Sequence, residues 1–159
     1  MNISVVIPNY NGQDLLKKNL PKVLEELESY KEGKIEVIVV DDKSEDNSTT
    51  VLNELIGKYK NLKFFENKKN LGFSSTVNKG AANAKYEILI LLNTDVYPQK
   101  GFLISLLKHF KDSNIFAVAC MDKSIEGDKI VLRGRGLGEW KRGFLVHKRG
   151  EVDKSNTLW

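Results

Sequence analysis

The chain has 159 residues, 41% of them apolar, which is the size of one domain with a sizeable core. Lys and Arg number 25 and Asp and Glu number 21, and the formal net charge of +4 is too weak to indicate a nucleic-acid-binding protein. The single cysteine, Cys120, excludes a disulfide within the chain, and we expect it to be buried in an apolar run. The N-terminus has no signal-peptide pattern, and no run approaches the roughly 18 apolar residues of a membrane span.

Short apolar segments alternate with helical patterns up to residue 121. Strands buried on both faces are expected at residues 3–8, 35–40, 62–65, 88–92 and 115–121, where the apolar runs are too short for helices. Helices are expected at residues 15–27, 48–56, 74–84 and 102–110, where apolar residues recur at three- and four-residue spacing. This order predicts an α/β fold, with an open, mostly parallel sheet and helices on both of its faces.

The amino-acid composition changes after Met121, where the chain becomes rich in Gly, Lys and Arg. Short alternating pieces predict loops and a β-hairpin rather than an independent domain. The expected organisation is therefore an α/β core at 1–122 and an extension of the same domain at 123–159.

Polar, turn-forming residues follow four consecutive predicted strands. They are Pro8-Asn9-Tyr10-Asn11-Gly12, then residues 41–46 (DDKSED), residues 67–72 and Asn93-Thr94-Asp95. Ordinary turn chemistry is the commoner use of each such group alone. Parallel α/β sheets, however, bind ligands outside the carboxyl ends of their strands. Four such groups therefore predict a ligand site at that end of the sheet.

Two of these groups have side chains suited to a nucleoside. Tyr10 offers a ring on which a base could stack, although a tyrosine at a rim can also pack on a neighbouring loop. A carboxylate after the second strand can accept hydrogen bonds from a base or a ribose. Because successive side chains point in opposite directions, only one of Asp41 and Asp42 is expected to face the ligand. The other is expected to bind local backbone N–H groups.

Asp95 is the best candidate for a metal ligand, with a turn residue before Tyr97-Pro98 as the alternative. Mg²⁺ or Mn²⁺ takes oxygen ligands and often uses one or two carboxylates together with diphosphate oxygens. Asn93 could add a neutral oxygen. Neither a GxGxxG dinucleotide fingerprint nor a GxxxxGK[ST] phosphate loop occurs in the chain.

The segments VVIPNYNG, VVDDKSEDNS and NLGFSSTVNKGAANAKYEILILLNTDVYP resemble, in order and spacing, the inverting glycosyltransferases of family 2, which have the GT-A fold. The resemblance covers residues 3 to about 122. It implies that the core at 1–122 binds a nucleotide sugar and that the chain stops short of an acceptor-binding part. The tail RGRGLGEWKRG also looks like a connecting segment of bacterial rhamnosyltransferase-like members.

The resemblance implies a role for each matching position. Asp42 would bind the base and Asp41 would support its loop, while Asp95 would be the metal ligand of a D-x-D motif. Asn93 departs from the first position of that motif and lowers the expected metal affinity. The implied donor-binding residues are Pro8, Asn9, Tyr10, Asp41, Asp42, Asn70, Gly72, Asn78, Asn93 and Thr94.

The resemblance also implies a reaction. A sugar would pass from a UDP- or dTDP-sugar to the hydroxyl of a glycan or lipid-linked acceptor, with Mg²⁺ or Mn²⁺, in the synthesis of a cell-surface polysaccharide or glycoconjugate. The catalytic base is expected beyond Trp159. We expect a cytoplasmic protein with no transmembrane segment in this chain, associated with a membrane only through its acceptor.

Two other functions are compatible with the sequence. One is a nucleotide-binding fragment or degenerate homologue without turnover, and the other is a structural module that keeps the fold and binds nothing. If the acceptor-binding part is absent, an uncovered apolar face would favour self-association.

Overall fold

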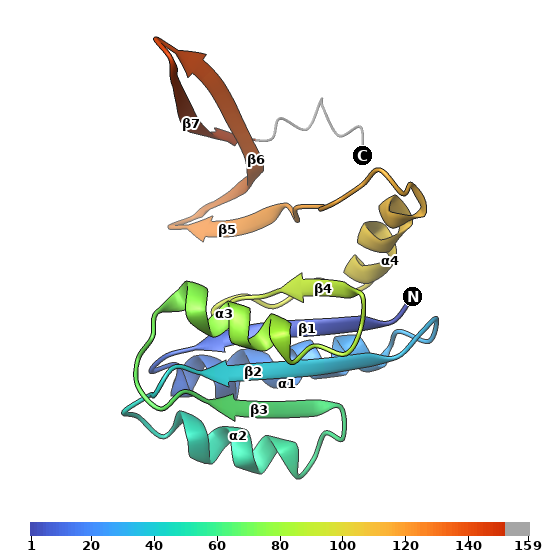
Figure 1. The fold of residues 1–159 in the computed structure, drawn as a ribbon, viewed down its shortest axis with the longest axis vertical. Coiled ribbons are helices and arrows are strands. Elements are labelled where there is room, and N and C mark those ends of the chain that lie inside the picture. The colour runs from blue at the N-terminus through green and yellow to red at the C-terminus, as the bar shows by residue number, and fades with distance from the viewer. Residues whose placement is uncertain (152–159) are drawn as a thin grey trace. The chain divides into compact units, whose positions relative to one another are not determined.

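The computed structural model describes the backbone of residues 1–151 and the side chains of residues 1–132, 141–144 and 146. It contains two compact units, Met1–Ile104 and Ser105–Trp159, which are described separately below (Figure 1). The division into 1–122 and 123–159 that the sequence suggests stays a prediction.

The first unit is built around a four-stranded parallel sheet. Its strands lie in the order β3-β2-β1-β4. Four of the expected strands and the α/β class are therefore confirmed. In chain order the elements are β1 (Ile3–Asn9), α1 (Gln13–Glu28), β2 (Ile35–Asp41), α2 (Ser48–Ile56), β3 (Leu62–Glu66), α3 (Phe73–Ala82), β4 (Ile88–Leu91) and the start of α4 (Phe102–Leu107).

Helices cover both faces of this sheet, as expected. A Cβ atom at Gly80 of α3 would lie 2.3 Å from a methyl group of Val6 and 3.3 Å from one of Val40, so α3 packs closely on one face. Ile7, the neighbour of Val6, instead lines a small cavity together with Leu16 of α1. Because successive side chains of a strand point to opposite faces, α1 lies on the face opposite α3. Helix α2 contacts α1 and β3 (Figure 1).

The core of the sheet consists of aliphatic side chains from β1 and β2. The four residues Val37 to Val40 are fully buried, without the in-and-out alternation of a strand that has one exposed face. Covered faces on both sides explain why these strands appear in the sequence as continuous apolar runs. Within the part of the chain that the structure describes, no helix combines the length and the apolar character needed to cross a bilayer.

A buried charged residue, Glu36, connects three strands near the amino end of the sheet. Its carboxylate accepts hydrogen bonds from Ser4 Oγ on β1 at 2.6 Å, from Lys63 Nζ on β3 at 2.6 Å and from the backbone N–H of Lys85 at 2.6 Å. Burial by itself raises the pKa of this carboxyl, but the hydrogen bonds outweigh it and the pKa is lowered. The network joins three strands to the segment between α3 and β4.

We expect Glu36→Gln to lower the free energy of unfolding at pH 7 by about 1–3 kcal/mol, since charge-assisted hydrogen bonds in a buried position are lost. Because the folded pKa is lowered, the stabilisation is complete above the ordinary value of 4.5 and disappears as the pH falls through the folded pKa. Urea titrations from pH 7 to pH 3 should therefore show wild type and variant converging in acid. Glu28→Gln, at an exposed position on α1, is the control. A gap that stays constant down to pH 3 would contradict the assignment.

The second unit contains an antiparallel sheet made of three strands, β5 (Asp122–Glu126), β6 (Lys129–Lys141) and β7 (Phe144–Glu151). The chain turns from β6 to β7 through Arg142 and Gly143, both with positive φ angles, which is the conformation that two-residue hairpin loops favour. The expected hairpin is thus confirmed, with one additional strand. A short 3₁₀ helix, Lys108–Lys111, follows α4.

The prediction of a strand at residues 115–121 is wrong. This segment has no regular secondary structure, and Phe116 and Met121 are exposed. Cys120, expected to be buried, is exposed as well. An apolar run indicates a segment that can be buried, but it does not identify the strand with which the segment would pair.

β4 is the outermost strand of the parallel sheet among the described residues, and its side chains are less buried than those of β1 and β2. Leu89 and Leu91 are exposed, at 44% and 59%. Self-association through an apolar face stays a prediction.

Candidate functional site

The strand ends that carry polar residues lie side by side. In the parallel register Asn9 is paired with Asp41, and Asp41 with Glu66, so the ends of β1, β2 and β3 are level. β4 ends at Leu91, which is paired with Val6 of β1. The sequence placed Asn9 and Asp41 just after their strands, whereas they are the last strand residues. Together these strand ends and the loops that follow them form the carboxyl end of the sheet.

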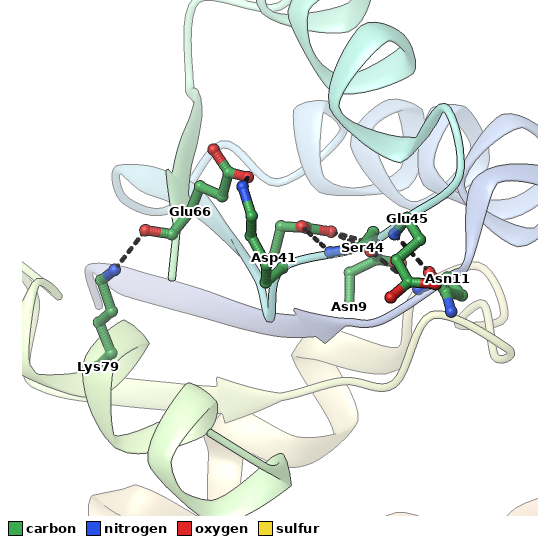
Figure 2. A network of polar contacts seen from close by, with 8 residues as sticks. Asn9, Asn11, Asp41, Ser44, Glu45, Glu66 and Lys79 are labelled. Carbon is green, nitrogen blue, oxygen red and sulfur yellow. Dashed lines mark hydrogen bonds and ion pairs between the residues drawn. The ribbon is translucent and has the colours of Figure 1, made fainter. Parts of the chain in front are cut away.

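Asn9 and Asp41 are joined by a buried network with Ser44 (Figure 2). Asn9 Nδ2 donates to Asp41 Oδ1 at 2.7 Å, and the Ser44 backbone N–H and hydroxyl donate to the two Asp41 oxygens at 2.8 and 2.6 Å. A Cβ atom at position 12 would lie 2.2 Å from Asn9 Oδ1, so Gly12 is required for this close approach. Asp41 therefore accepts hydrogen bonds from the loop that follows it.

Further hydrogen bonds hold the loop after β1 against the loop after β2. The Asn11 backbone N–H donates to Ser44 Oγ at 2.8 Å, and Asn11 Oδ1 accepts from the Glu45 backbone N–H at 2.8 Å (Figure 2). The Gln13 backbone N–H donates to Asp46 Oδ2 at 2.9 Å. Asn11 and Lys43 have φ angles of 49° and 64°, a region that non-glycine residues rarely adopt. The surrounding contacts hold this strained backbone in place.

Asp42 points to a different loop, the segment between β3 and α3. Its Oδ1 accepts from Asn67 Nδ2 at 2.7 Å and from the Leu71 backbone N–H at 2.9 Å, and its Oδ2 accepts from the Gly72 backbone N–H at 2.7 Å. The side chain is almost completely buried, at 4% exposure. Asp42 thus connects the end of β2 to the start of α3.

Burial alone would raise the pKa of Asp42, but hydrogen bonds from Asn67, Leu71 and Gly72 outweigh it, and the pKa is lowered. The carboxylate is therefore ionised at neutral pH. Both aspartates accept hydrogen bonds from loop N–H groups, Asp41 from its own loop and Asp42 from the segment before α3. The expectation that only one of them faces a ligand stays a prediction. Direct contact between Asp42 and a base stays a prediction.

Two residues that the sequence reasoning gave no role complete this part of the site. Asn67, buried, donates to Asp42, and its Oδ1 accepts from Lys79 Nζ at 2.9 Å. Lys79 Nζ also donates to the Glu66 carbonyl at 2.8 Å (Figure 2). Lys43 forms an ion pair with the Glu66 side chain at 3.0 Å. Lys79 therefore brings a positive charge to the carboxyl end of the sheet. The sequence signal that could have identified Lys79 is its position between Asn78, a predicted donor-binding residue, and Gly80.

Other predicted donor-binding residues are accessible at the same end. Tyr10 follows β1 and is 49% exposed, so its ring is free for stacking. Pro8 is partly buried, while Asn70 and Gly72, just before α3, and Asn78, within α3, are exposed. Gly72 has a φ angle of +82°, which favours glycine, and its N–H also approaches Asn70 Oδ1 at 3.1 Å.

Asn93 and Asp95 follow β4, and both are exposed. Among the residues whose side chains the structure describes, none forms a hydrogen bond or an ion pair with the Asp95 carboxylate. Thr94 between them is held at its carbonyl oxygen by Asn19 Nδ2 at 2.8 Å. The predicted metal ligand is thus an available oxygen donor, unlike Asp41 and Asp42.

These residues fit a divalent cation only in part. Their donor set, one carboxylate and one amide oxygen, has the hard-oxygen chemistry that Mg²⁺ and Mn²⁺ prefer. In the part of the chain described by the structure, however, no three carboxylate, His or Cys side chains gather into a cluster that could hold a metal. A cation here would therefore take most of its ligands from a diphosphate and from water.

A family model described as glycosyl transferase family 2 matches residues 4–157, nearly the whole chain. The chain belongs to this family of glycosyltransferases. Among its relatives, the poly(ribitol-phosphate) beta-N-acetylglucosaminyltransferase TarP of Staphylococcus aureus (strain N315) is 32% identical over 98% of this chain and 44% of the relative. The dolichol-phosphate mannosyltransferase of Pyrococcus furiosus is 27% identical over 82% of this chain and 35% of the relative.

Solved structures show the same architecture. The mannosyltransferase PcManGT from Pyrobaculum calidifontis, in complex with GDP-Man and Mn²⁺, superposes with a TM-score of 0.68 at 25% identity, over 74% of this chain and 34% of that one. S. aureus TarS in complex with UDP gives a TM-score of 0.61 at 25% identity, over 70% and 32%. The expected GT-A fold is confirmed. This chain spans less than half the length of these relatives.

Proposed function

We propose that the chain is the donor-binding part of a glycosyltransferase that takes a sugar from a nucleotide-diphosphate sugar. The observation that carries the proposal is the gathering of four strand-end groups at the carboxyl end of one parallel sheet. Buried Asp41 and Asp42 hold the loops there, while Tyr10 and Asp95 remain accessible. A stacking ring, a positive Lys79 and an available carboxylate are the groups that a nucleoside diphosphate with a cation would need.

In the proposed reaction, the acceptor hydroxyl oxygen attacks the anomeric carbon while the bond from that carbon to the diphosphate breaks. The hydroxyl proton passes to a carboxylate base, and the configuration at the carbon is inverted. A bound Mg²⁺ or Mn²⁺ supplies positive charge that offsets the charge on the departing diphosphate. Tyr10 would orient the base and Asp95 would hold the cation. We assign the base to none of the residues that the structure describes.

We further propose that the acceptor is a hydroxyl of a glycan or of a lipid-linked or polyol-phosphate carrier at the cell surface. The names of the relatives, which include a poly(ribitol-phosphate) and a dolichol-phosphate transferase, support this class. The likeness of the tail RGRGLGEWKRG to rhamnosyltransferase-like members has no such support, so the proposal does not extend to rhamnose. A cytoplasmic location, with membrane association only through the acceptor, stays a prediction.

Calorimetric titration with UDP, GDP and dTDP, each with MnCl₂ and with EDTA, tests the proposal. We expect one of these nucleotides to bind in MnCl₂ with an affinity that falls at least about tenfold in EDTA. The same fall is expected in Asp95→Ala, since the Asp95 carboxylate contributes to binding only through the metal. Glu54→Ala, at an exposed position on α2, should leave binding unchanged.

Each alternative function predicts a different titration. Binding that is indifferent to metal and to Asp95 would contradict the metal-dependent site and favour a nucleotide-binding module without turnover. Failure of all three nucleotides to bind would favour a structural module.

A further inference from the structure

The segment that follows β4, residues 93–101 (the β4 loop), is attached to α1 by side chains from one row of the helix. Asn19 Nδ2 donates to the Thr94 carbonyl at 2.8 Å. Lys22 Nζ lies 4.5 Å from the centre of the Tyr97 ring. Glu26 Oε1 accepts from the Gly101 backbone N–H at 2.6 Å. Spacings of three and four residues place these side chains on one side of the helix.

Asn19 is the most deeply buried member of this row. It is 4% exposed and lies among apolar residues of α1 such as Leu16 and Leu20. A buried amide is unfavourable unless it is hydrogen-bonded, and Asn19 Oδ1 has no partner among the described residues. Leucine would pack at this position without that disadvantage. What the amide adds is the hydrogen bond to Thr94.

That hydrogen bond is made to the peptide group next to the predicted metal ligand, Asp95. The Thr94 carbonyl belongs to the peptide group that joins Thr94 to Asp95, and a peptide group is rigid and planar. Holding its oxygen therefore fixes the orientation in which the backbone enters Asp95. The bond spans 75 positions of the sequence.

Glu26 holds the other end of the β4 loop. Gly101, its partner, has a φ angle of +79° and immediately precedes α4. The two hydrogen bonds, one at Thr94 and one at Gly101, together bracket the loop. The Lys22 ammonium over the Tyr97 ring adds a weaker contact between them.

We propose that Asn19 and Glu26 are positioning residues, which hold the β4 loop on α1 so that Asp95 is presented to a metal–diphosphate. The proposal rests on the proposed donor-binding function. A loop held in its binding conformation before the ligand arrives loses less freedom on binding. If the loop is released and adopts that conformation only a tenth of the time, the apparent affinity falls tenfold.

The variants to compare are Asn19→Leu, which keeps the number of side-chain heavy atoms and removes the donor, and Glu26→Met, which removes the acceptor. Glu26→Gln restores an acceptor oxygen, and Glu25→Met makes the same change at the neighbouring exposed position. The first measurement is amide hydrogen exchange without ligand. We expect exchange in residues 94–101 to become about tenfold faster in Asn19→Leu and Glu26→Met, and to stay at the wild-type rate in Glu26→Gln and Glu25→Met.

The second measurement is nucleotide affinity, with MnCl₂ and with EDTA. We expect Asn19→Leu to weaken binding about tenfold in MnCl₂, to leave binding in EDTA unchanged, and to have no further effect in an Asp95→Ala background. Equal losses in both conditions, or a full loss on top of Asp95→Ala, would overturn the proposal.

The two measurements separate this proposal from the proposed function. Unchanged hydrogen exchange in residues 94–101 would overturn the anchoring role whatever the chain binds. If the wild type binds no nucleotide, the proposed function fails, and hydrogen exchange still decides whether α1 anchors the β4 loop.

Discussion

Asp42→Ala is expected to lower the free energy of unfolding by about 2–4 kcal/mol. The substitution leaves three N–H donors, from Asn67, Leu71 and Gly72, without their acceptor. Hydrogen bonds to a charged group contribute roughly 1.5–3 kcal/mol each, but those of one cluster are not additive. The two backbone donors can also reach water once the carboxylate is gone, since Leu71 and Gly72 are exposed.

The control for this substitution is Asp95→Ala, which removes an exposed aspartate at the same end of the sheet. Asp95 is exposed and accepts no hydrogen bond from the residues whose side chains are described, so Asp95→Ala should change stability by less than about 0.5 kcal/mol. Asp42→Asn, which keeps one acceptor oxygen, should fall between wild type and Asp42→Ala. Urea denaturation followed by circular dichroism provides the comparison. Equal stabilities of Asp42→Ala and Asp95→Ala would contradict the role assigned to Asp42.

The effect of Asp42→Ala should also depend on pH. Because the folded pKa of Asp42 is lowered, its stabilisation is complete above the ordinary value of 3.8 and is lost as the pH falls through the folded pKa. The difference between wild type and variant should therefore be constant from about pH 5 to pH 8 and narrow in stronger acid. A difference that grows in acid would mean that the folded structure stabilises the Asp42 carboxyl group mainly in its protonated form.

Gly80→Val is expected to destabilise the chain by about 3 kcal/mol or more, and Gly80→Ala by about 1–2 kcal/mol. A Cβ atom there would meet Val6 at 2.3 Å and Val40 at 3.3 Å, and both valines are fully buried in the sheet. A methyl group must therefore push α3 away from β1 and β2. For alanine, the higher helix propensity offsets roughly 0.5–1 kcal/mol of this cost.

A double-mutant cycle shows whether the contact with Val6 is the cause. Val6→Ala removes the methyl group that the new side chain would meet, so Gly80→Ala should cost about 1–2 kcal/mol less in that background. Gly57→Ala is the matched control, because its Cβ would meet nothing closer than a carbonyl oxygen at 3.5 Å. It should be neutral or stabilising. Additive effects of Gly80→Ala and Val6→Ala would refute the proposed clash.

Most of the elements and the location of the candidate site could be predicted from local patterns. The apolar runs of β1 and β2 reflect burial on both faces, which any continuous run of β-branched residues indicates. Polar groups after four strands pointed to one end of the sheet, because the carboxyl ends of parallel strands coincide. The failure at residues 115–121 has the same origin, since a local pattern contains no information about a strand's neighbour.

The sequence by itself determined the α/β class and the family, and it predicted a candidate site at the carboxyl end of the sheet. Only the tertiary structure decided the partners of each polar side chain. It joins Asp41 to Asn9, Asp42 to the loop before α3, and Asn19 to Thr94. Hydrogen bonds form between atoms that are close in space, and the order of residues along the chain does not specify which distant segments become neighbours.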